Sequence, residues 1–415
     1  MHTFATKPVD FYKKAISCAN HYGFLSIDEL DQILKEEAAS DPEARPIAKQ
    51  VKYEPVLEQK HKKVDATSRD FEAALKQLTQ KNITPGKRPL LFYTSNLDLE
   101  ALKGGAPLPK TVSFSLHALG MKHSIAEALI VKTARAILDD AGEKETFVAL
   151  NSIGCRDSSA KFVREATAQL RKHLGDLPPT VGQAFKEDVF LAYKSLFKRS
   201  DAPEDLPRPM EFLSSVSRKH LREVLEFFEA AEIPYIFDDR LLGHRDCYTQ
   251  TIFEIKPVDE EAYSIAEQEE SVAYARGGRY DELAKRYFKT NTPAVGISFT
   301  CKPETTTKIV IQRVTLPRTT RKPRVFFIQL GYAAQLKSLA IIETLRKARI
   351  PLEQNLDGNR LSDQLAYAES LAIPYTVIMG QKEALEGNVI VRDTTTRAQQ
   401  TVAVDMLPIF FKTAK

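Results

Sequence analysis

The chain has 415 residues, more than one ordinary hydrophobic core can use, so we expect two or three domains. A hydrophobic fraction of 43% and a charged fraction of 27% are typical of a soluble globular protein. No apolar run approaches the roughly 20 residues that cross a bilayer, and the N-terminus lacks the apolar stretch of a secretory signal. Four scattered cysteines without a CxxC pair fit a reducing cytoplasm. The net charge of +4 permits a nucleic-acid partner without requiring one.

The first 154 residues predict helices and strands of a single core. Residues 11–27 have the apolar spacing of a helix, whereas residues 28–110 are charged and give no clear pattern. The alternation in 111–119 predicts a strand, and 145–154 reads as a buried strand. Between them, Ser124-x-x-Glu127 has the form of a capping box, which predicts a helix from there to Gly142.

The next 150 residues divide into a helical part and a strand-rich part. Residues 155–233 are helical and have the character of an insertion, with a proline-rich stretch at 176–210. Residues 234–300 alternate, are rich in aromatic and β-branched side chains, and lack long intervening helices. This pattern predicts an antiparallel sheet that leaves one face open to a ligand.

The C-terminal part of the chain predicts a second domain. Residues 303–323 are rich in threonine and proline and read as a linker. In 324–415, strands alternate with helices, which predicts crossover connections and a largely parallel sheet. The fold class is therefore an α+β core with an antiparallel sheet (1–302), followed by an α/β domain.

The segment GGRYD is the sharpest local candidate for a ligand pocket. Gly277 and Gly278 allow a close backbone approach or a positive φ, Arg279 offers a planar fork to an anion, and Tyr280 an aromatic wall. The alternative is a tight hairpin with a solvent-facing arginine. It is not a phosphate-binding loop, because GxxxxGK[ST] is absent and GGRYD does not open an obvious helix.

Polar residues of 240–254 form a second group of candidates. Strand alternation places Tyr248, Gln250 and Glu254 on one face, and Asp246 with them if the strand begins that early. A polar row on an apolar sheet is costly unless it meets water, a ligand or its own partners. An ordinary solvated face is the alternative. The spacing of His117 and His123, without a carboxylate cluster, does not predict a metal site.

The C-terminal domain carries scattered cations and several amides. Asn355, Asn359 and Gln364 could read base edges, and Arg360 and Arg392 could contact phosphates. Scattered surface cations of this kind are also common in proteins that bind no RNA.

Several segments in a fixed order resemble the histidyl-tRNA synthetase family of class II aminoacyl-tRNA synthetases. The matching segments are RLLGHRDCYTQTIFE (240–254), GGRYDEL (277–283), PAVGISFTCKPE (293–304) and the stretch from 355 to 393. The resemblance covers roughly residues 111 to 415. It implies a class II core whose pocket includes Gly296, an anticodon-binding type of terminal domain, a tRNA partner and a homodimer.

The departures from the family pattern concern cations. The family has an arginine where this chain has Gly243, and another at the end of its third motif, where Lys302 and Pro303 stand here. We find no segment that corresponds to the arginine-bearing second motif. Joining a carboxylate to the α-phosphate of ATP needs fixed cations around the developing charge. Arg245 and Arg276 are the nearest candidates to replace them, although alternation points Arg245 away from Asp246.

Three functions follow as hypotheses. The first is a non-catalytic paralogue that binds tRNA, another structured RNA or a protein partner, without a required cofactor. The second is a divergent histidine–tRNA ligase, which would use ATP and Mg²⁺. The third is a regulatory subunit of the kind that partners ATP phosphoribosyltransferase, a family that typically lacks the terminal domain seen here.

Overall fold

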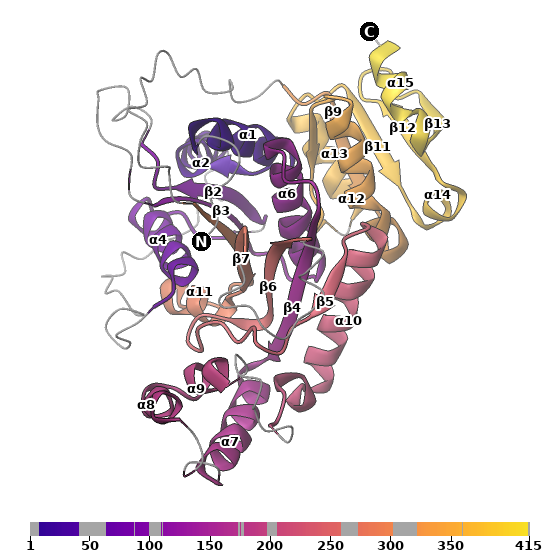
Figure 1. Ribbon diagram of the computed structural model, residues 1–415. Coiled ribbons are helices and arrows are strands. Elements are labelled where there is room, and N and C mark those ends of the chain that lie inside the picture. Colours follow the sequence, from indigo (N-terminus) through magenta and orange to yellow (C-terminus); the bar gives the residue numbers. More distant parts are fainter. Residues whose placement is uncertain are drawn as a thin grey trace.

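A computed structural model describes the chain as two sheets with helices packed against them (Figure 1). It describes residues 8–40, 64–86, 88–98, 109, 111–172, 175, 178–196, 206–258, 273–301, 322–358 and 360–413. In these ranges no helix is long and apolar enough to span a membrane. The predicted linker, and Lys302 and Pro303 with it, lies almost wholly outside the described residues.

The core is an eight-stranded sheet with the strand order β1-β2-β3-β8-β7-β6-β4-β5. All neighbours are antiparallel except the two outer pairs, β1–β2 and β4–β5. The strands are β1 (Leu25–Ser26), β2 (Leu90–Ser95), β3 (Val112–Leu119), β4 (Thr146–Gly154), β5 (Tyr235–Phe237), β6 (Thr249–Pro257), β7 (Ala275–Arg279) and β8 (Ala294–Cys301). The antiparallel sheet confirms the predicted fold class of the core.

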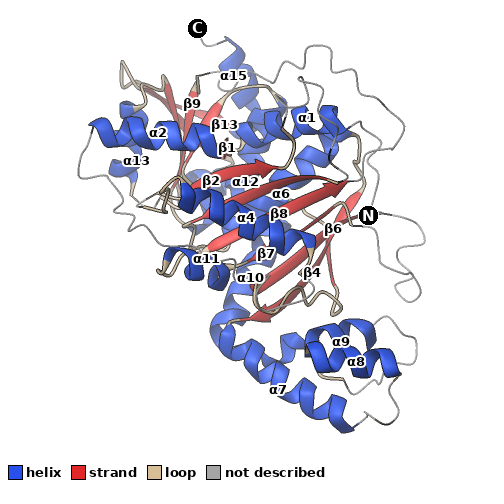
Figure 2. Ribbon diagram, turned by 90° about the vertical axis from the view of Figure 1, so that its left-hand side faces the viewer, coloured by secondary structure: helices blue, strands red, loops and turns tan. Residues whose placement is uncertain are grey.

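Helices cover both faces of this sheet. On one face lie α1 (Pro8–His21), α6 (Ile125–Ala141) and α10 (Ser215–Ala230), which bury one continuous apolar cluster. On the other lie α2 (Ile27–Ser40), α4 (Ala66–Gln80) and α11 (Asp281–Phe288). The predicted insertion forms α7 (Arg156–Lys172), α8 (Pro179–Glu187) and α9 (Val189–Leu196), which project from one end of the sheet (Figure 2).

The C-terminal lobe has a five-stranded sheet in the order β10-β9-β11-β12-β13. Its elements are β9 (Val325–Gln329), α12 (Tyr332–Lys347), β10 (Leu352–Gln354), α13 (Leu361–Ser370), β11 (Tyr375–Met379), α14 (Gln381–Glu386), β12 (Asn388–Asp393), β13 (Gln399–Ala403) and α15 (Leu407–Thr413). Strands β10, β9 and β11 are parallel, but β12 and β13 are antiparallel. After β11 the short α14 returns the chain without a full crossover, so the last two strands form a hairpin.

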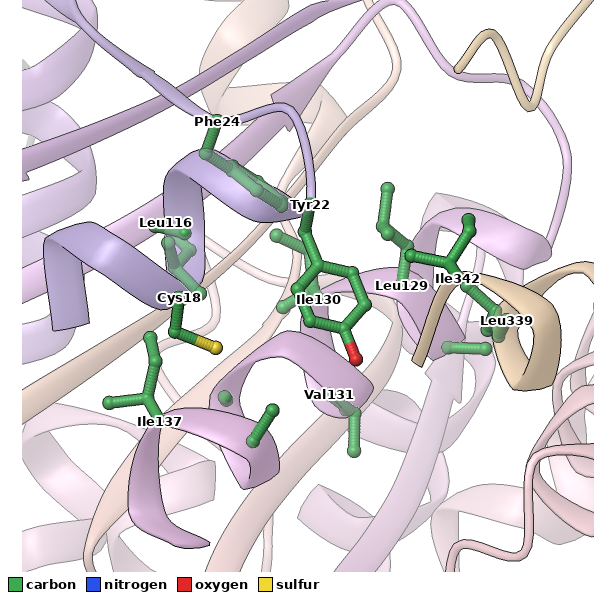
Figure 3. Close-up of a cluster of buried hydrophobic side chains, with 14 of the residues drawn as sticks. Cys18, Tyr22, Phe24, Leu116, Leu129, Ile130, Val131, Ile137, Leu339 and Ile342 are labelled. Atoms are coloured by element: carbon green, nitrogen blue, oxygen red, sulfur yellow. The ribbon is translucent and has the colours of Figure 1, made fainter. Parts of the chain in front are cut away.

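The two lobes share one hydrophobic cluster rather than meeting across a polar surface. Cys18 of α1 and Tyr22 in the turn after it belong to the same buried cluster as Leu339 and Ile342 of α12, with Tyr22 between Cys18 and the α12 side chains (Figure 3). The buried Tyr22 hydroxyl donates to Glu343 at 2.5 Å. This contact places a hydrogen bond to a carboxylate inside the interface, where each lost partner is costly.

Arg346 completes the contact between the lobes. Its guanidinium binds Glu343 at 2.8 Å and reaches Asp140 at the end of α6 at 2.9 Å. Glu343 is 9% exposed and Asp140 lies at the rim, so the ion pair runs from the buried interface to solvent. The orientation of the C-terminal lobe is thus fixed by packing and by charge together.

We expect Tyr22→Phe to lower the free energy of unfolding by about 1.5–3 kcal/mol, because it leaves a buried carboxylate with one donor fewer. Tyr235→Phe is the matched control, since its hydroxyl donates to Glu229 at 3.1 Å on the surface and should cost under about 0.5 kcal/mol. Urea denaturation of both variants gives the comparison. Equal losses would show that burial of the interface hydrogen bond does not matter.

Candidate functional site

A cavity of about 340 Å³ opens where β6, β7 and β8 face α4 and α9. Its charged lining comes from four elements far apart in the sequence. These residues are Asp65 before α4, Lys194 on α9, Glu254 on β6 and Arg276 on β7. The antiparallel pairing of β6 with β7 sets Glu254 directly opposite Arg276. A concave site with a few converging polar groups is the usual form of a small-molecule pocket.

Most charges on this cavity are already paired within the protein. The Arg276 Nε atom lies 2.9 Å from Glu254 Oε1, and Lys256 approaches the other carboxylate oxygen of Glu254 at 3.4 Å. Asp65 caps α4, because its carboxylate accepts from the backbone and hydroxyl of Ser68. Lys194 is the one lining cation that makes no ion pair with another described residue.

Ser298 gives the cavity a polar floor. Its hydroxyl donates to Asp70 Oδ2 at 2.5 Å and accepts from Ser115 at 2.9 Å. Burial raises the pKa of Asp70 to about 6 although Ser298 opposes that shift. In the described part of the chain, no three His, Cys, Asp or Glu side chains converge to hold a metal ion.

The GGRYD segment is neither a loop nor a hairpin. Gly277, Gly278 and Arg279 end strand β7, and Asp281 opens helix α11, contrary to the expectation that the segment opens no helix. Neither glycine has a positive φ. A Cβ on Gly277 would lie 2.2 Å from the Gly296 carbonyl oxygen of the next strand. Close packing of the strands therefore requires glycine at these positions. Of Gly277, Gly278 and Gly296, only Gly277 lines the cavity.

Arg279 does not offer its fork to a ligand, which corrects the sequence interpretation. It is 2% exposed, and its Nε and Nη2 atoms donate to Glu127 at 2.8 and 2.7 Å. His220 of α10 also reaches Glu127, at 2.8 Å. Burial alone would raise the pKa of Glu127, but the charges of Arg279 and His220 hold it well below its usual range. The three side chains join β7, α6 and α10.

The same carboxylate explains why the predicted capping box is wrong. Ser124 has helical backbone angles and makes no side-chain capping bond; its hydroxyl donates to Glu223 at 2.9 Å instead. Glu127 points inward to Arg279 instead of back to the helix end. The predictions that Glu127 lies on this helix and that the helix ends at Gly142, where φ is +105°, are confirmed.

Tyr280 and Asp246 also lie outside the cavity lining. Tyr280 is fully buried, and its hydroxyl lies 2.9 Å from Nδ1 of His117. Burial lowers the pKa of His117 to about 3, so the imidazole is neutral near pH 7. Asp246 accepts from Arg286 of α11 at 3.2 Å. These two candidates therefore help to hold the core together.

The predicted row of polar residues on one face is interrupted. Strand β6 begins only at Thr249, and its pairing with β7 shifts between Thr249 and Ile252. Gln250 has a φ of +55°, so simple alternation fails there. Tyr248 and Glu254 still line the cavity. Arg245 is not on a strand; it faces Asp188 at 3.8 Å and does not line the cavity.

Gly243 occupies a backbone position that excludes other side chains. Its φ is +62°, and a Cβ built there would lie 2.5 Å from the ring of Tyr248. L-amino acids with a Cβ rarely adopt such angles. At the position where the resemblance implies an arginine, the backbone angles and the tyrosine ring both oppose one.

The candidate RNA-contacting residues of the C-terminal lobe differ in their exposure. Gln364 is 3% exposed and donates to the Gly358 carbonyl at 3.1 Å, so its amide faces inward. Arg392 lies 3.9 Å from Glu369. Arg360 is exposed, Asn355 is half-buried, and Asn359 is outside the described residues. The burial of Gln364 corrects the prediction that its amide reads base edges.

Asp65 and Lys194 are the charged cavity residues that sequence reasoning missed. Asp65 is the N-cap of α4 and Lys194 lies on α9, in stretches that showed no functional motif. The form Asp65-x-x-Ser68 is an N-cap signal and could have placed the start of α4. Nothing local to Lys194 indicates that α9 folds against the pocket.

We expect Glu127→Gln to lower the free energy of unfolding by about 3–5 kcal/mol, because Arg279 stays buried without a full counter-charge. Since the pKa of Glu127 is lowered in the folded state, its contribution is present above the unfolded pKa of about 4.3 and is lost as pH falls below it. The gap between wild type and variant, from denaturation at pH 7 and pH 3, should therefore shrink in acid. Glu165→Gln, at an exposed site on α7, is the control. A gap that does not change with pH would argue against the buried ion pair.

Comparisons with known proteins agree with this architecture. The family model for the anticodon binding domain matches residues 324–413. A histidine–tRNA ligase of Dehalococcoides mccartyi is 28% identical over 297 residues, which cover 71% of this chain and 68% of that protein. One from Caldicellulosiruptor saccharolyticus is 27% identical over 327 residues, covering 78% and 75%.

Among solved structures, the apo histidyl-tRNA synthetase of S. aureus aligns over 82% of both chains, with 18% identity and a TM-score of 0.41. A Bacillus halodurans structure described as an ATP phosphoribosyltransferase regulatory subunit/histidyl-tRNA synthetase has a TM-score of 0.39. It is 15% identical and covers 89% of this chain and 92% of that one. The domain match thus identifies residues 324–413 as an anticodon binding domain, and over about 70–78% of its length the chain is similar to histidine–tRNA ligases, which are 27–28% identical to it.

Proposed function

We propose that the chain is a non-catalytic member of the histidyl-tRNA synthetase family that binds tRNA. The observation that carries the proposal is Gly243, which stands where the family has an arginine and whose Cβ space is filled by Tyr248. Adenylation joins two anions, so it depends on cations fixed in advance around the reacting phosphate. Loss of one preorganised group at such a centre costs on the order of 10²–10³ in rate.

The remaining cations of the cavity support the proposal. Arg276 is held by Glu254, and Arg245 and Arg279 point to partners away from the cavity. Among the described residues that line the cavity, Lys194 is the cation left to meet a phosphate. Because Asp65 and Glu254 also line the cavity, its described charges sum to about zero. This balance fits a small zwitterion better than it fits a triphosphate.

The tRNA partner is proposed from the C-terminal lobe. Its match to the anticodon binding domain covers 90 residues, from 324 to 413, and the sequence relatives above are histidine–tRNA ligases. Cations that are missing from the cavity of the core do not affect RNA contacts made by residues 324–413. A protein partner and a homodimer stay expectations from the resemblance.

The decisive measurement is histidine-dependent exchange of pyrophosphate into ATP. We expect no exchange above background, with the Caldicellulosiruptor saccharolyticus ligase run in parallel as the positive control. The same preparation should bind a fluorescein-labelled tRNA-His transcript in an anisotropy titration. Exchange that falls at least tenfold in Arg276→Ala or Arg245→Ala, with Lys289→Ala as a control, would instead identify an active ligase with displaced arginines.

Gly243→Ala tests whether the backbone excludes a side chain. We expect a loss of stability well above the roughly 1 kcal/mol of left-handed strain, because Tyr248 must also move. Gly387→Ala is the matched control, since Gly387 has a φ of +70° and open space around it. Thermal unfolding compares the two. If both variants lose the same stability, the ring of Tyr248 is no obstacle to a side chain.

A further inference from the structure

We infer that a hollow at the base of the C-terminal lobe binds the phosphate backbone of an RNA strand. The inference deepens the proposed function, on which it rests, by assigning the RNA a surface. It involves none of the residues that the sequence pattern first suggested for RNA contact.

The hollow has a volume of about 350 Å³ and a ring of positive charge. Four cations line it: Lys322, Arg324, Arg349 and Lys412. Between them lie Ala348, Ile350, Pro351 and Phe411, which give it an apolar floor. No Asp or Glu is among the described residues that line it.

Three separate segments bring these cations together. Lys322 and Arg324 precede β9, Arg349 follows α12 in a left-handed conformation with φ of +59°, and Lys412 is on α15. The Arg324 backbone amide donates to the Pro351 carbonyl at 2.9 Å, and its side chain donates to the Phe411 carbonyl at 3.1 Å. The packing of β9, α12 and α15 therefore fixes the positions of the segments that carry these four cations.

The cations of the ring differ from the other basic residues nearby. Lys347 and Lys382 pair with Glu343 and Glu386 on their own helices, and Arg392 approaches Glu369. By contrast, Lys322, Arg349 and Lys412 are exposed and make no ion pair with any described residue. Like charges held close together repel one another, and a bound anion relieves that repulsion.

A polymer fits this place better than a single anion. A cavity of about 780 Å³ between the lobes adjoins the hollow, since Arg349 and Pro351 line both. Arg346 and Lys347 line that cavity too, together with the carboxylates of Asp140 and Glu353, so the unpaired positive charge is concentrated in the hollow. A strand could place successive phosphates on the exposed side chains of Lys322, Arg349 and Lys412, because contacts to successive phosphates hold and orient a nucleic-acid strand.

The test compares two double variants that remove the same charge from the same lobe. Lys322→Ala with Lys412→Ala alters the ring, and Lys337→Ala with Lys382→Ala alters exposed lysines outside it. The probe is the fluorescein-labelled tRNA-His transcript, titrated by anisotropy from 50 to 300 mM KCl. We expect the ring variant to bind at least tenfold more weakly at 100 mM KCl. Its salt slope should fall by about 1.4–1.8, the loss of two phosphate contacts, while the control stays within about twofold of wild type.

Other outcomes separate this inference from the proposed function. Equal effects of the two double variants would overturn the assigned surface and leave tRNA binding intact. No binding by the wild-type chain would remove the proposed function and this inference with it. Displacement of the transcript by poly-glutamate as readily as by poly(U) would also overturn it, in favour of an acidic protein partner.

Discussion

The ion pair between Arg279 and Glu127 is the constraint on which the core depends. Two charges removed from water must be satisfied almost completely, or the fold loses several kcal/mol. Here Glu127 accepts from Arg279, His220 and Thr251, so one carboxylate connects β7, α10 and β6 to α6. The wall of the cavity is made of β6 and β7, and its geometry therefore follows from a contact on the opposite face of the sheet.

Under the proposed function, this arrangement explains how the pocket keeps its shape without the cations that adenylation needs. Arg279 cannot change without depriving the buried Glu127 of its bidentate counter-charge, whereas a cation at position 243 would hold no part of the fold together. An arginine that holds the fold together and an arginine that would bind a phosphate are thus required for different physical reasons. In this chain the first kind is present as Arg279, and the ring of Tyr248 fills the space that a side chain at position 243 would need.

Sequence reasoning succeeded where the signal is local. The strand predicted at 111–119, observed at Val112–Leu119, and the helix that ends at Gly142 are set by residues within a few positions of one another, and both were found. It failed where a partner is distant. Glu127 fits a local capping motif, but its true partner is 152 residues away, and no periodicity reveals that pairing. Lys194 reaches the cavity only because the projecting group of α7, α8 and α9 brings α9 to its edge, and nothing in the sequence of α9 itself indicates this position.

The hydrophobic cluster that runs through both lobes has a thermodynamic consequence. Because Tyr22 and Leu339 belong to one buried unit, the C-terminal lobe cannot detach without exposing part of the core. Any ligand held by the native C-terminal lobe alone therefore stabilises the whole chain by mass action, by about 2.7 kcal/mol when its free concentration is 100 times Kd. The melting temperature of the core therefore rises when the C-terminal lobe binds a ligand.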